Sequence, residues 1–257
     1  MTNSMENNPE EDLEVSTHAE DLKFRLVTVD LLRTAKKHYT YRQLSEKTNL
    51  PITVLSRYAK GHVLPNSERA RHLWRALSKI VGLETEVRKR IKFNEDGYFD
   101  NTSIVGDMSL LTQAANYALA KFAGRRITKV LTAAVDGIPL ATMMANSLGV
   151  NLVIAKCSKE VGVPSFLEET YVLDPSGVTM MLYVPKDAIK RRDSILVVDD
   201  MVKSGDTQAA LINLVNKAKA ELAGVFALIA IGDDWQRKMK MTKDCPVEVL
   251  LGLEPPK

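Results

Sequence analysis

Apolar residues recur at helical spacing along the first third of the chain. Leu22, Leu26, Val29 and Leu32 lie three or four residues apart, and this pattern predicts a helix over residues 22–36. The same spacing, read together with cap and turn residues, predicts three further helices over residues 41–48, 52–60 and 67–80. This part of the chain is therefore expected to be all-α.

Cap and turn residues separate the three shorter helices. Thr40 is expected to cap the first of them, and Asn66 or Ser67 the third. A tight turn is expected at residues 49–51, and Gly61 is expected to end the second helix. The core that the helices share is expected to contain four apolar residues, Leu44, Leu50, Leu55 and Trp74.

The remainder of the chain alternates between short apolar blocks and amphipathic stretches. The blocks predict strands over residues 129–135, 151–155, 179–184, 194–199, 225–231 and 247–253, and the stretches predict helices over residues 109–123, 140–148 and 207–222. Such alternation is typical of an α/β fold with a mostly parallel sheet covered by helices. We expect an α-helical domain over residues 21–98 and an α/β domain over residues 99–257.

Charge is distributed unevenly over these parts. Residues 1–20 hold six acidic residues and no Lys or Arg, which predicts an acidic disordered tail. Residues 21–92 hold 17 Lys and Arg against six Asp and Glu, whereas residues 93–257 hold 18 against 20. A basic block beside a nearly neutral one predicts two domains with different partners.

Two classes of protein are disfavoured by the same sequence. The apolar runs are too short to span a bilayer, and the acidic N-terminal stretch lacks the apolar segment of a secretory signal. Cys157 and Cys245 are the only cysteines, and they have no metal-type spacing. A cytoplasmic protein is therefore expected, and no metal-binding cysteine motif.

The segment that begins YTYRQLSEKTNLPITVLSRYAKG, over roughly residues 39–78, resembles the helix-turn-helix unit of Cro-type repressors. Asn49 stands where that family usually has Gly, and Leu55, Ser56 and Arg57 match an Ile-Ser-Arg sequence that its recognition helix often carries. A helix in the major groove presents its N-terminal side chains to the base edges. Base reading is therefore expected from Ile52, Thr53, Ser56 and Arg57, and phosphate contacts from Arg42 and Lys60, with Arg69 and Arg71 as further candidates. A basic helical bundle that binds another protein is the alternative.

In the α/β domain, the stretch SILVVDDMVKSGDTQ runs from a buried-type strand into two acids and a small-residue loop. A loop that leads into a helix exposes backbone N–H groups beside the positive end of the helix, and this arrangement suits a phosphate. Ser204 and Thr207 add hydroxyl groups, and Lys203 adds charge. Asp199 and Asp200 would repel that phosphate, so we expect them to face sugar hydroxyls or a divalent cation.

This stretch resembles the motif with which type I phosphoribosyltransferases bind 5-phosphoribosyl-1-pyrophosphate (PRPP). The resemblance implies that Asp199 and Asp200 contact the ribose hydroxyls, and that the loop from Lys203 through Ser204, Gly205, Asp206 and Thr207 holds the 5′-phosphate. Asp206 departs from the motif, which usually has a small neutral residue there; its side chain is expected to point away while its N–H group still serves.

A second segment, AAVDGIPLATMMANSLG, resembles the pyrophosphate loop of the same family and the helix that follows it. Asp136 and Gly137 would then lie near the pyrophosphate, and Lys156 would contact it. The resemblance also implies Mg²⁺ bound together with PRPP. A structural acid pair or a metal site at the end of a Rossmann-like strand is the alternative reading of Asp199 and Asp200.

Residues 157–178 correspond to the flexible catalytic loop of that family. Orotate-type enzymes carry a catalytic lysine there, whereas here Lys159 is the only lysine and the tip is expected at Glu168 and Glu169. We therefore expect no orotate-type transferase, and we expect the domain to be inactive as a transferase. Trp235, after a later strand, is a candidate for stacking on a purine base, and a role in core packing is the alternative.

A helix-turn-helix joined to a PRPP-binding domain resembles archaeal phosphoribosyltransferase-like transcription regulators, and is analogous to the purine-operon repressor of Gram-positive bacteria. The resemblance implies a homodimeric regulator that binds a palindromic DNA operator and senses PRPP or a purine nucleotide. The alternative is an active purine phosphoribosyltransferase with an accessory DNA-binding domain.

Overall fold

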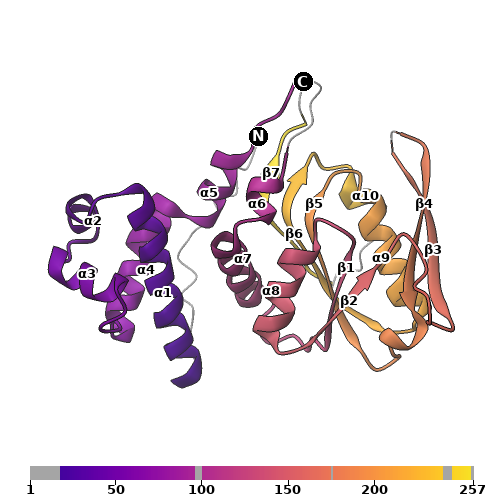
Figure 1. Cartoon of the computed structure of the whole chain (residues 1–257), viewed down its shortest axis with the longest axis horizontal. Helices are drawn as coiled ribbons and strands as arrows, with labels where there is room; N and C mark the ends of the chain where they lie inside the picture. The colour runs from indigo at the N-terminus through magenta and orange to yellow at the C-terminus, as the bar shows by residue number, and fades with distance from the viewer. Residues whose placement is uncertain (1–17, 96–99, 175, 240–244, 256–257) are drawn as a thin grey trace, which may run out of the picture. The chain divides into compact units, whose positions relative to one another are not determined.

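The computed structural model describes residues 18–95, 100–174, 176–239 and 245–255 (Figure 1). The chain divides into two compact units, Met1–Gly82 and Leu83–Lys257. The helices are α1 (His18–His38), α2 (Tyr41–Thr48), α3 (Ile52–Ala59), α4 (Ser67–Val81), α5 (Leu83–Arg90), α6 (Thr102–Val105), α7 (Met108–Lys121), α8 (Ile138–Leu148), α9 (Asp206–Lys217) and α10 (Trp235–Met239), with a 3-10 turn at Lys186–Ala188. The strands are β1 (Lys129–Ala133), β2 (Asn151–Ala155), β3 (Phe166–Leu173), β4 (Val178–Pro185), β5 (Ser194–Val202), β6 (Glu221–Ile231) and β7 (Val247–Leu253).

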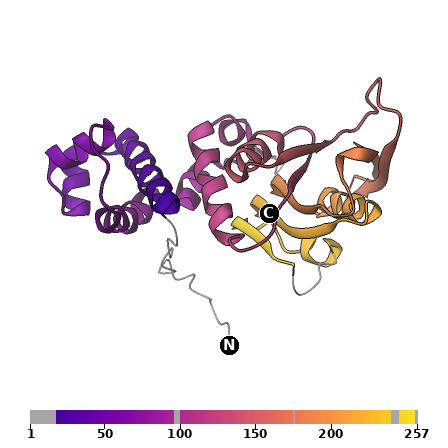
Figure 2. The same cartoon turned by 90° about the horizontal axis from the view of Figure 1, so that it is seen from below.

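In the first unit, α1 to α4 surround one apolar core (Figures 1 and 2). Thr40 forms a capping box with Gln43 at the start of α2, and Asn66 caps α4 through the Arg69 amide. Asn49 adopts the left-handed conformation, with φ of 53°, in the turn between α2 and α3. The local signals in the sequence therefore placed α2, α3 and α4 within one residue of their observed ends, whereas α1 extends beyond the predicted 22–36 at both ends.

Two of the four predicted core residues lie at the periphery of the core. Leu44 and Leu55 are fully buried, whereas Leu50 and Trp74 are half-buried and pack against the core from outside. The start of the unit also differs from the expectation, because α1 begins at His18, inside the stretch predicted to be a disordered tail. The rest of that predicted tail, residues 1–17, lies outside the described residues.

The second unit contains a five-stranded sheet in the order β2-β1-β5-β6-β7, and all its neighbouring strands are parallel. Its central strands bury side chains on both faces. One face packs against α7 and α8, and the other packs against α9. The predicted α/β class with a mostly parallel sheet is therefore confirmed. The short parallel crossovers place every strand's carboxyl end at the same edge of the sheet.

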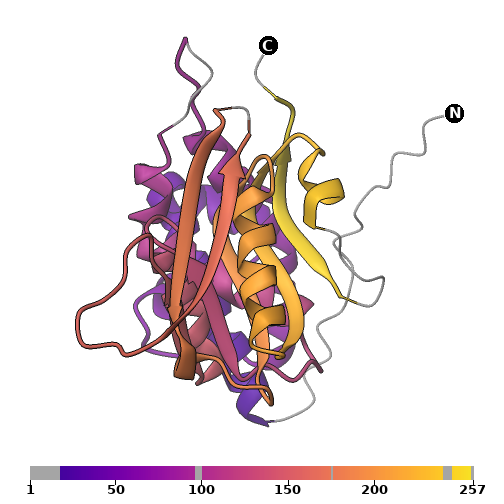
Figure 3. The same cartoon turned by 90° about the vertical axis from the view of Figure 1, so that its right-hand side faces the viewer.

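A separate antiparallel hairpin, β3–β4, lies against α9 (Figure 3). The prediction was wrong here in two respects, because residues 157–178 contain a strand and the strand at 179–184 does not join the main sheet. Glu168 and Glu169 lie within β3 and not at a loop tip, and they pair with Lys159 and Lys217 respectively. These ion pairs explain how two adjacent acids sit in a strand.

Two further boundaries differ from the sequence reading. The helix predicted to end at residue 222 ends at Lys217, because Lys219 has φ of 55° and β6 starts at Glu221. The structure divides the chain after Gly82, whereas the sequence placed the division after residue 98. Short α5 contacts α7 and β7, and its Val87 is buried in the α/β core. Among the described residues, no helix has the length and apolar character needed to cross a membrane.

Candidate functional site

Asp199 and Asp200 lie near the carboxyl end of β5, at the edge where ligands bind in parallel sheets. Their exposed fractions are only 7% and 8%. The Gln208 side chain donates a hydrogen bond of 2.6 Å to Asp199 Oδ2 and another of 3.2 Å to the Met201 carbonyl, so α9 fixes the orientation of the first acid. Both acids are thus held in place by the fold before any ligand arrives.

The loop after β1 closes on Asp199 through Gly137. A Cβ at Gly137 would overlap Thr132 Oγ1 and lie 2.6 Å from Asp199 Oδ1. Only glycine can therefore occupy this position without moving its neighbours. The structure in this way brings together the two motifs that the sequence singled out separately, residues 133–149 and residues 194–208.

Burial makes the two acids unusual. Loss of hydration raises the pKa of Asp199 well above its ordinary value, and the neighbouring Asp200 raises it further. Burial also raises the pKa of Asp200, although hydrogen bonds from Asp199 and Asn101 act in the opposite direction. A ligand that offers hydroxyl donors or a cation would stabilise the two buried carboxylates, whereas an anion without such groups would be repelled by them.

Asn101 is a site residue that the sequence reading missed. Its amide nitrogen donates to Asp200 Oδ2 at 2.7 Å and lies 3.4 Å from Asp136 Oδ2. It therefore bridges the acid at the end of β5 and the acid in the loop after β1. No local signal marks Asn101, because its partner is 99 residues away in the chain.

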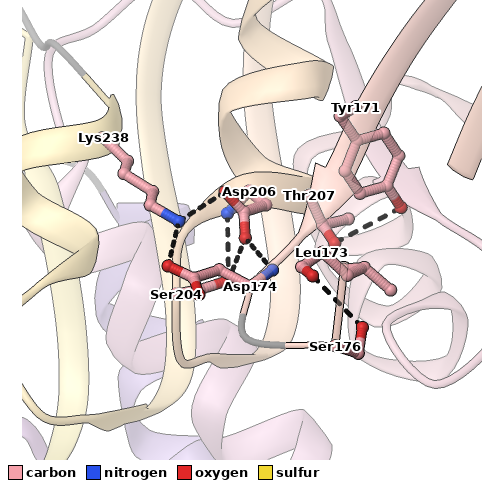
Figure 4. Close-up of polar contacts among 8 residues, drawn as sticks. All are labelled: Tyr171, Leu173, Asp174, Ser176, Ser204, Asp206, Thr207 and Lys238. Atoms are coloured by element: carbon pink, nitrogen blue, oxygen red, sulfur yellow. Dashed lines mark hydrogen bonds and ion pairs between the residues drawn. The ribbon is translucent and has the colours of Figure 1, made fainter. Parts of the chain in front are cut away.

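The predicted phosphate loop runs from the end of β5 into α9 (Figure 4). Gly205 has φ of 81°, and a Cβ there would come within 3.0 Å of the Trp235 backbone. The loop therefore packs tightly on the start of α10. The loop leads directly into the first turn of α9, where backbone N–H groups have no partner within the helix. Such N–H groups can bind an anion.

The Asp206 carboxylate is turned toward the hairpin and α10. Its Oδ2 accepts from Ser204 Oγ at 2.6 Å and from the Asp174 N–H at 3.0 Å, and its Oδ1 accepts from Lys238 Nζ at 2.8 Å (Figure 4). Burial opposes its ionisation, but the hydrogen bonds from Lys238 and Ser204 outweigh burial and lower the pKa of Asp206. Thr207 Oγ1 lies 3.5 Å from the Tyr171 hydroxyl. The loop is thus tied to β3 at two points.

The remaining predicted ligand residues lie in different surroundings. Lys203 is exposed in the phosphate loop, whereas Lys156 pairs with Glu160 Oε1 at 2.7 Å. Trp235 is only 7% exposed, and its indole N–H donates to the Gly232 carbonyl at 2.8 Å. In this conformation the Trp235 ring is a core residue and leaves little surface for a base to cover.

In the helical unit, α3 divides into a buried and an exposed face. Leu55 and Tyr58 are buried, whereas Ile52, Thr53 and Arg57 are exposed and Ser56 is half-buried. Four further cations of the helical unit are also exposed: Lys60, Arg42, Arg69 and Arg71. Arg42 pairs with Glu46 at 3.6 Å, and Arg69 donates to the Tyr58 hydroxyl at 3.3 Å. The face presents both polar side chains and positive charge, as a DNA-reading helix requires.

Comparison with known sequences relates the α/β unit to two groups of proteins. The profile of the phosphoribosyl transferase domain family matches residues 107–250. The purine biosynthesis transcriptional repressor PurR of Bacillus subtilis is 33% identical over 133 residues, which are 52% of this chain and 47% of that protein. The xanthine phosphoribosyltransferase of Lactococcus lactis subsp. cremoris is 30% identical over 148 residues, which are 54% of this chain and 75% of that protein. The chain spans about half the length of the PurR relatives that it matches.

Solved structures agree with this relationship at the level of the fold. The adenine phosphoribosyltransferase of Thermoanaerobacter pseudethanolicus has a TM-score of 0.59 at 20% identity, over 66% of this chain and 99% of that one. The adenine phosphoribosyltransferase of Rhodothermus marinus has a TM-score of 0.57 at 29% identity, over 66% of this chain and 98% of that one. The α/β unit therefore has the type I phosphoribosyltransferase fold.

Proposed function

The chain belongs to the phosphoribosyl transferase domain family, and from that premise we propose that it is a DNA-binding transcription regulator whose α/β unit binds PRPP or a purine nucleotide as effector. One observation carries the proposal. A single chain joins a helical unit with an exposed, basic helix face to an α/β unit whose sheet edge combines buried acids with a phosphate loop. The match to PurR relatives supports this combination.

The proposed effector site uses each group for a separate part of the ligand. Asp199 and Asp200 accept hydrogen bonds from the ribose hydroxyls, and the hydroxyl that reaches Asp200 displaces the Asn101 amide. The N–H groups at the start of α9 bind the 5′-phosphate. Lys238 holds the Asp206 carboxylate away from that phosphate, which reduces the repulsion between the two anions.

Mg²⁺ fits this site only together with the ligand. Among the described residues, no group of three or more His, Cys, Asp or Glu side chains is arranged to hold a metal. Mg²⁺ usually takes one or two carboxylates and completes its shell with water and phosphate oxygens. Asp136 and Asp200, which both face Asn101, are the carboxylates that would hold it, and the ion would neutralise charge on the pyrophosphate.

On the DNA side, Ile52, Thr53, Ser56 and Arg57 read bases, and Arg42 and Lys60 hold phosphates, with Arg69 and Arg71 as further phosphate contacts. We propose that the protein acts as a homodimer on a palindromic operator, with half-sites about one helical turn, ~34 Å, or a multiple of it apart. Two copies of α3 would then lie in successive major grooves on one side of the duplex.

The experiment that tests this function measures operator affinity over a titration with PRPP and with purine nucleotides, at fixed salt and Mg²⁺. An effector acts only through its different affinity for the two protein states, and a typical coupling of about 1–3 kcal/mol corresponds to a change of roughly 5–150-fold. We expect a change in this range for at least one ligand. A flat curve at saturating ligand would contradict the sensor function.

The DNA reading makes a second prediction, about Arg57 and Lys60. Arg57→Ala is expected to weaken specific binding by about 1–3 kcal/mol, because a good base contact contributes that much. Lys60→Ala is expected to weaken all sequences alike and to flatten the salt dependence, since a phosphate contact carries no sequence information. Fluorescence anisotropy with DNA from upstream of the gene that encodes this protein, and with scrambled DNA, separates the two effects. Equal losses for both variants on both duplexes would argue against these roles.

An active purine phosphoribosyltransferase is a second candidate function, because xanthine phosphoribosyltransferases also match. Orotate, adenine, guanine, hypoxanthine and xanthine are each expected to give negligible transfer. The expectation rests on Trp235, whose ring is buried and so does not offer the predicted stacking surface for a base. Product formation in a PRPP-dependent assay at ordinary enzyme rates, about 1 s⁻¹ or more, would favour the enzyme.

A further inference from the structure

Three loops of the α/β unit meet at the amino-terminal edge of the sheet, opposite the proposed effector site. They precede β1, β5 and β6, which are adjacent parallel strands. Neighbouring strands lie about 4.8 Å apart, so the three strand starts span only about 10 Å. Side chains on these loops therefore share one surface.

Asp193 fastens the three loops to one another. Its carboxylate accepts from Thr128 Oγ1 at 3.2 Å and from the Lys190 N–H at 2.7 Å, and it pairs with Lys129 Nζ at 2.8 Å. Its backbone carbonyl accepts from the Glu221 N–H at 3.0 Å. These polar contacts thus fix the loops to one another, and the Lys129 ammonium group neutralises the negative charge of Asp193.

The surface of these loops is strongly basic. Six exposed cations project from it: Arg125, Arg126, Lys190, Arg191, Arg192 and Lys219. Arg126 also donates from Nη1 and Nη2 to the Arg192 carbonyl, each at 3.1 Å, and these hydrogen bonds join two of the loops directly. Asp187 and Glu221, the latter at the start of β6, are exposed acids beside these six cations, and Lys186 is a further exposed cation next to Asp187, so positive charge predominates.

This concentration of charge is not a property of the whole unit. Residues 93–257 hold 18 Lys and Arg against 20 Asp and Glu, yet seven of those 18 cations, the six above and Lys186, lie on these three loops. The opposite edge of the sheet carries Asp136, Asp199 and Asp200. The exposed cations of these loops therefore lie at the edge opposite the proposed effector site, and such a concentration of positive charge attracts a polyanion.

We propose that this basic edge, defined by the six cations, binds the phosphate backbone of duplex DNA outside the bases that α3 reads. The inference rests on the proposed DNA-binding function and extends it from the helical unit to the α/β unit. Duplex DNA carries about one negative charge for every 1.7 Å of its axis and a layer of condensed counterions. A dense group of arginines and lysines neutralises the phosphates and releases those counterions from the DNA. Such contacts add affinity without adding sequence preference.

The test compares two triple variants of the full chain. Lys190→Ala/Arg191→Ala/Arg192→Ala removes three cations of the basic edge, while the backbone atoms that contact Asp193 and Arg126 remain. Arg88→Ala/Lys121→Ala/Arg237→Ala removes three exposed cations elsewhere in the same unit, with the same change in net charge. Affinity for the chain's own upstream duplex and for a scrambled duplex of equal length is measured at several salt concentrations.

The basic-edge variant is expected to lose at least about tenfold in affinity near 0.1 M salt, to a similar extent on both duplexes. Its salt slope is expected to fall by up to about 2.7, at about 0.9 for each lost phosphate contact. The control variant keeps the wild-type slope, and both variants keep the wild-type melting temperature. Equal behaviour of the two variants, or a loss confined to one duplex, would overturn the inference. A wild-type protein without salt-sensitive DNA affinity would instead refute the regulator function itself.

Discussion

Replacing Asp199 and Asp200 together by asparagine is expected to weaken PRPP binding strongly and at the same time to raise the melting temperature of the α/β unit. Each carboxylate is a charged acceptor for a ribose hydroxyl, and such hydrogen bonds contribute about 1.5–3 kcal/mol each, whereas the neutral oxygen of asparagine contributes about 0.5–1.5 kcal/mol. The two substitutions together are therefore expected to cost about 2–3 kcal/mol, which corresponds to a loss of affinity of roughly 30-fold to 150-fold.

The gain in stability has a separate cause. Both acids are buried, and burial beside another acid raises their pKa values. A carboxyl group whose pKa is raised by folding is most favourable to the folded state below its unfolded pKa, and that stability is lost as pH rises through the folded value. At neutral pH the pair therefore destabilises the unliganded unit. Each kcal/mol that asparagine recovers is expected to raise the melting temperature by about 2–4 °C.

Thermal unfolding at several pH values, with and without PRPP, measures both effects. The double variant is expected to melt at a higher temperature than the wild type at pH 7 and to lack the gain in stability that the wild type shows on acidification. At a PRPP concentration that saturates the wild type, its melting temperature is expected to shift much less. Asp233→Asn/Asp234→Asn is a matched control, because these adjacent acids follow the neighbouring strand β6 but are exposed. A PRPP shift of normal size in the Asp199/Asp200 variant would contradict the assignment of the diol site.

Leu55→Ala is expected to lower the melting temperature of the helical unit strongly and to leave the melting temperature of the α/β unit unchanged. Leu55 is fully buried in the core of the helical unit. Truncating such a leucine costs about 2–5 kcal/mol, and in a domain of this size 1 kcal/mol moves the melting temperature by about 4–8 °C. A decrease of roughly 8–40 °C is therefore expected for this transition, with loss of DNA binding above the new melting temperature.

Ile52→Ala is the control on the same helix, because Ile52 is 46% exposed and belongs to the proposed base-reading face. It is expected to keep the melting temperature and to weaken operator binding. Differential scanning calorimetry in the presence of PRPP separates the two units, since the ligand shifts only the transition of the α/β unit. A Leu55→Ala variant in which both transitions fall together would show that the units do not unfold independently.

Much of the fold could be predicted from local signals. The helices of the first unit follow from Thr40, Asn49, Gly61 and Asn66, whose capping and left-handed conformations depend on near neighbours alone. The strands of the main sheet follow from apolar runs that are buried on both faces. These elements need no knowledge of distant contacts, so their existence and type were predicted, although β5 extends three residues beyond its predicted end and β6 begins four residues before its predicted start.

The errors arose where a distant partner decides the conformation. Glu168 and Glu169 suggested a polar loop tip, but Lys159 and Lys217 neutralise them within β3. Trp235 suggested a stacking surface, but Gly205 allows the phosphate loop to pack on its backbone and the indole is buried. Asn101 contacts Asp200 although the two residues are 99 positions apart in the chain, and no sequence motif marks Asn101. The positions of the two ligand motifs were thus predictable, whereas their neighbours were not.

The β3–β4 hairpin has a consequence for the time scale on which this unit can respond. A two-stranded ribbon is only marginally stable by itself, so its position depends on α9 and on the ties at Asp174 and Tyr171. Hairpins re-form within about 1–10 µs, whereas a five-stranded sheet opens only when most of its domain unfolds. We expect backbone amides of β3 and β4 to exchange with solvent deuterium long before those of β1, β5 and β6. The hairpin is then the fast element of the unit, and the sheet beneath the acids is the slow one.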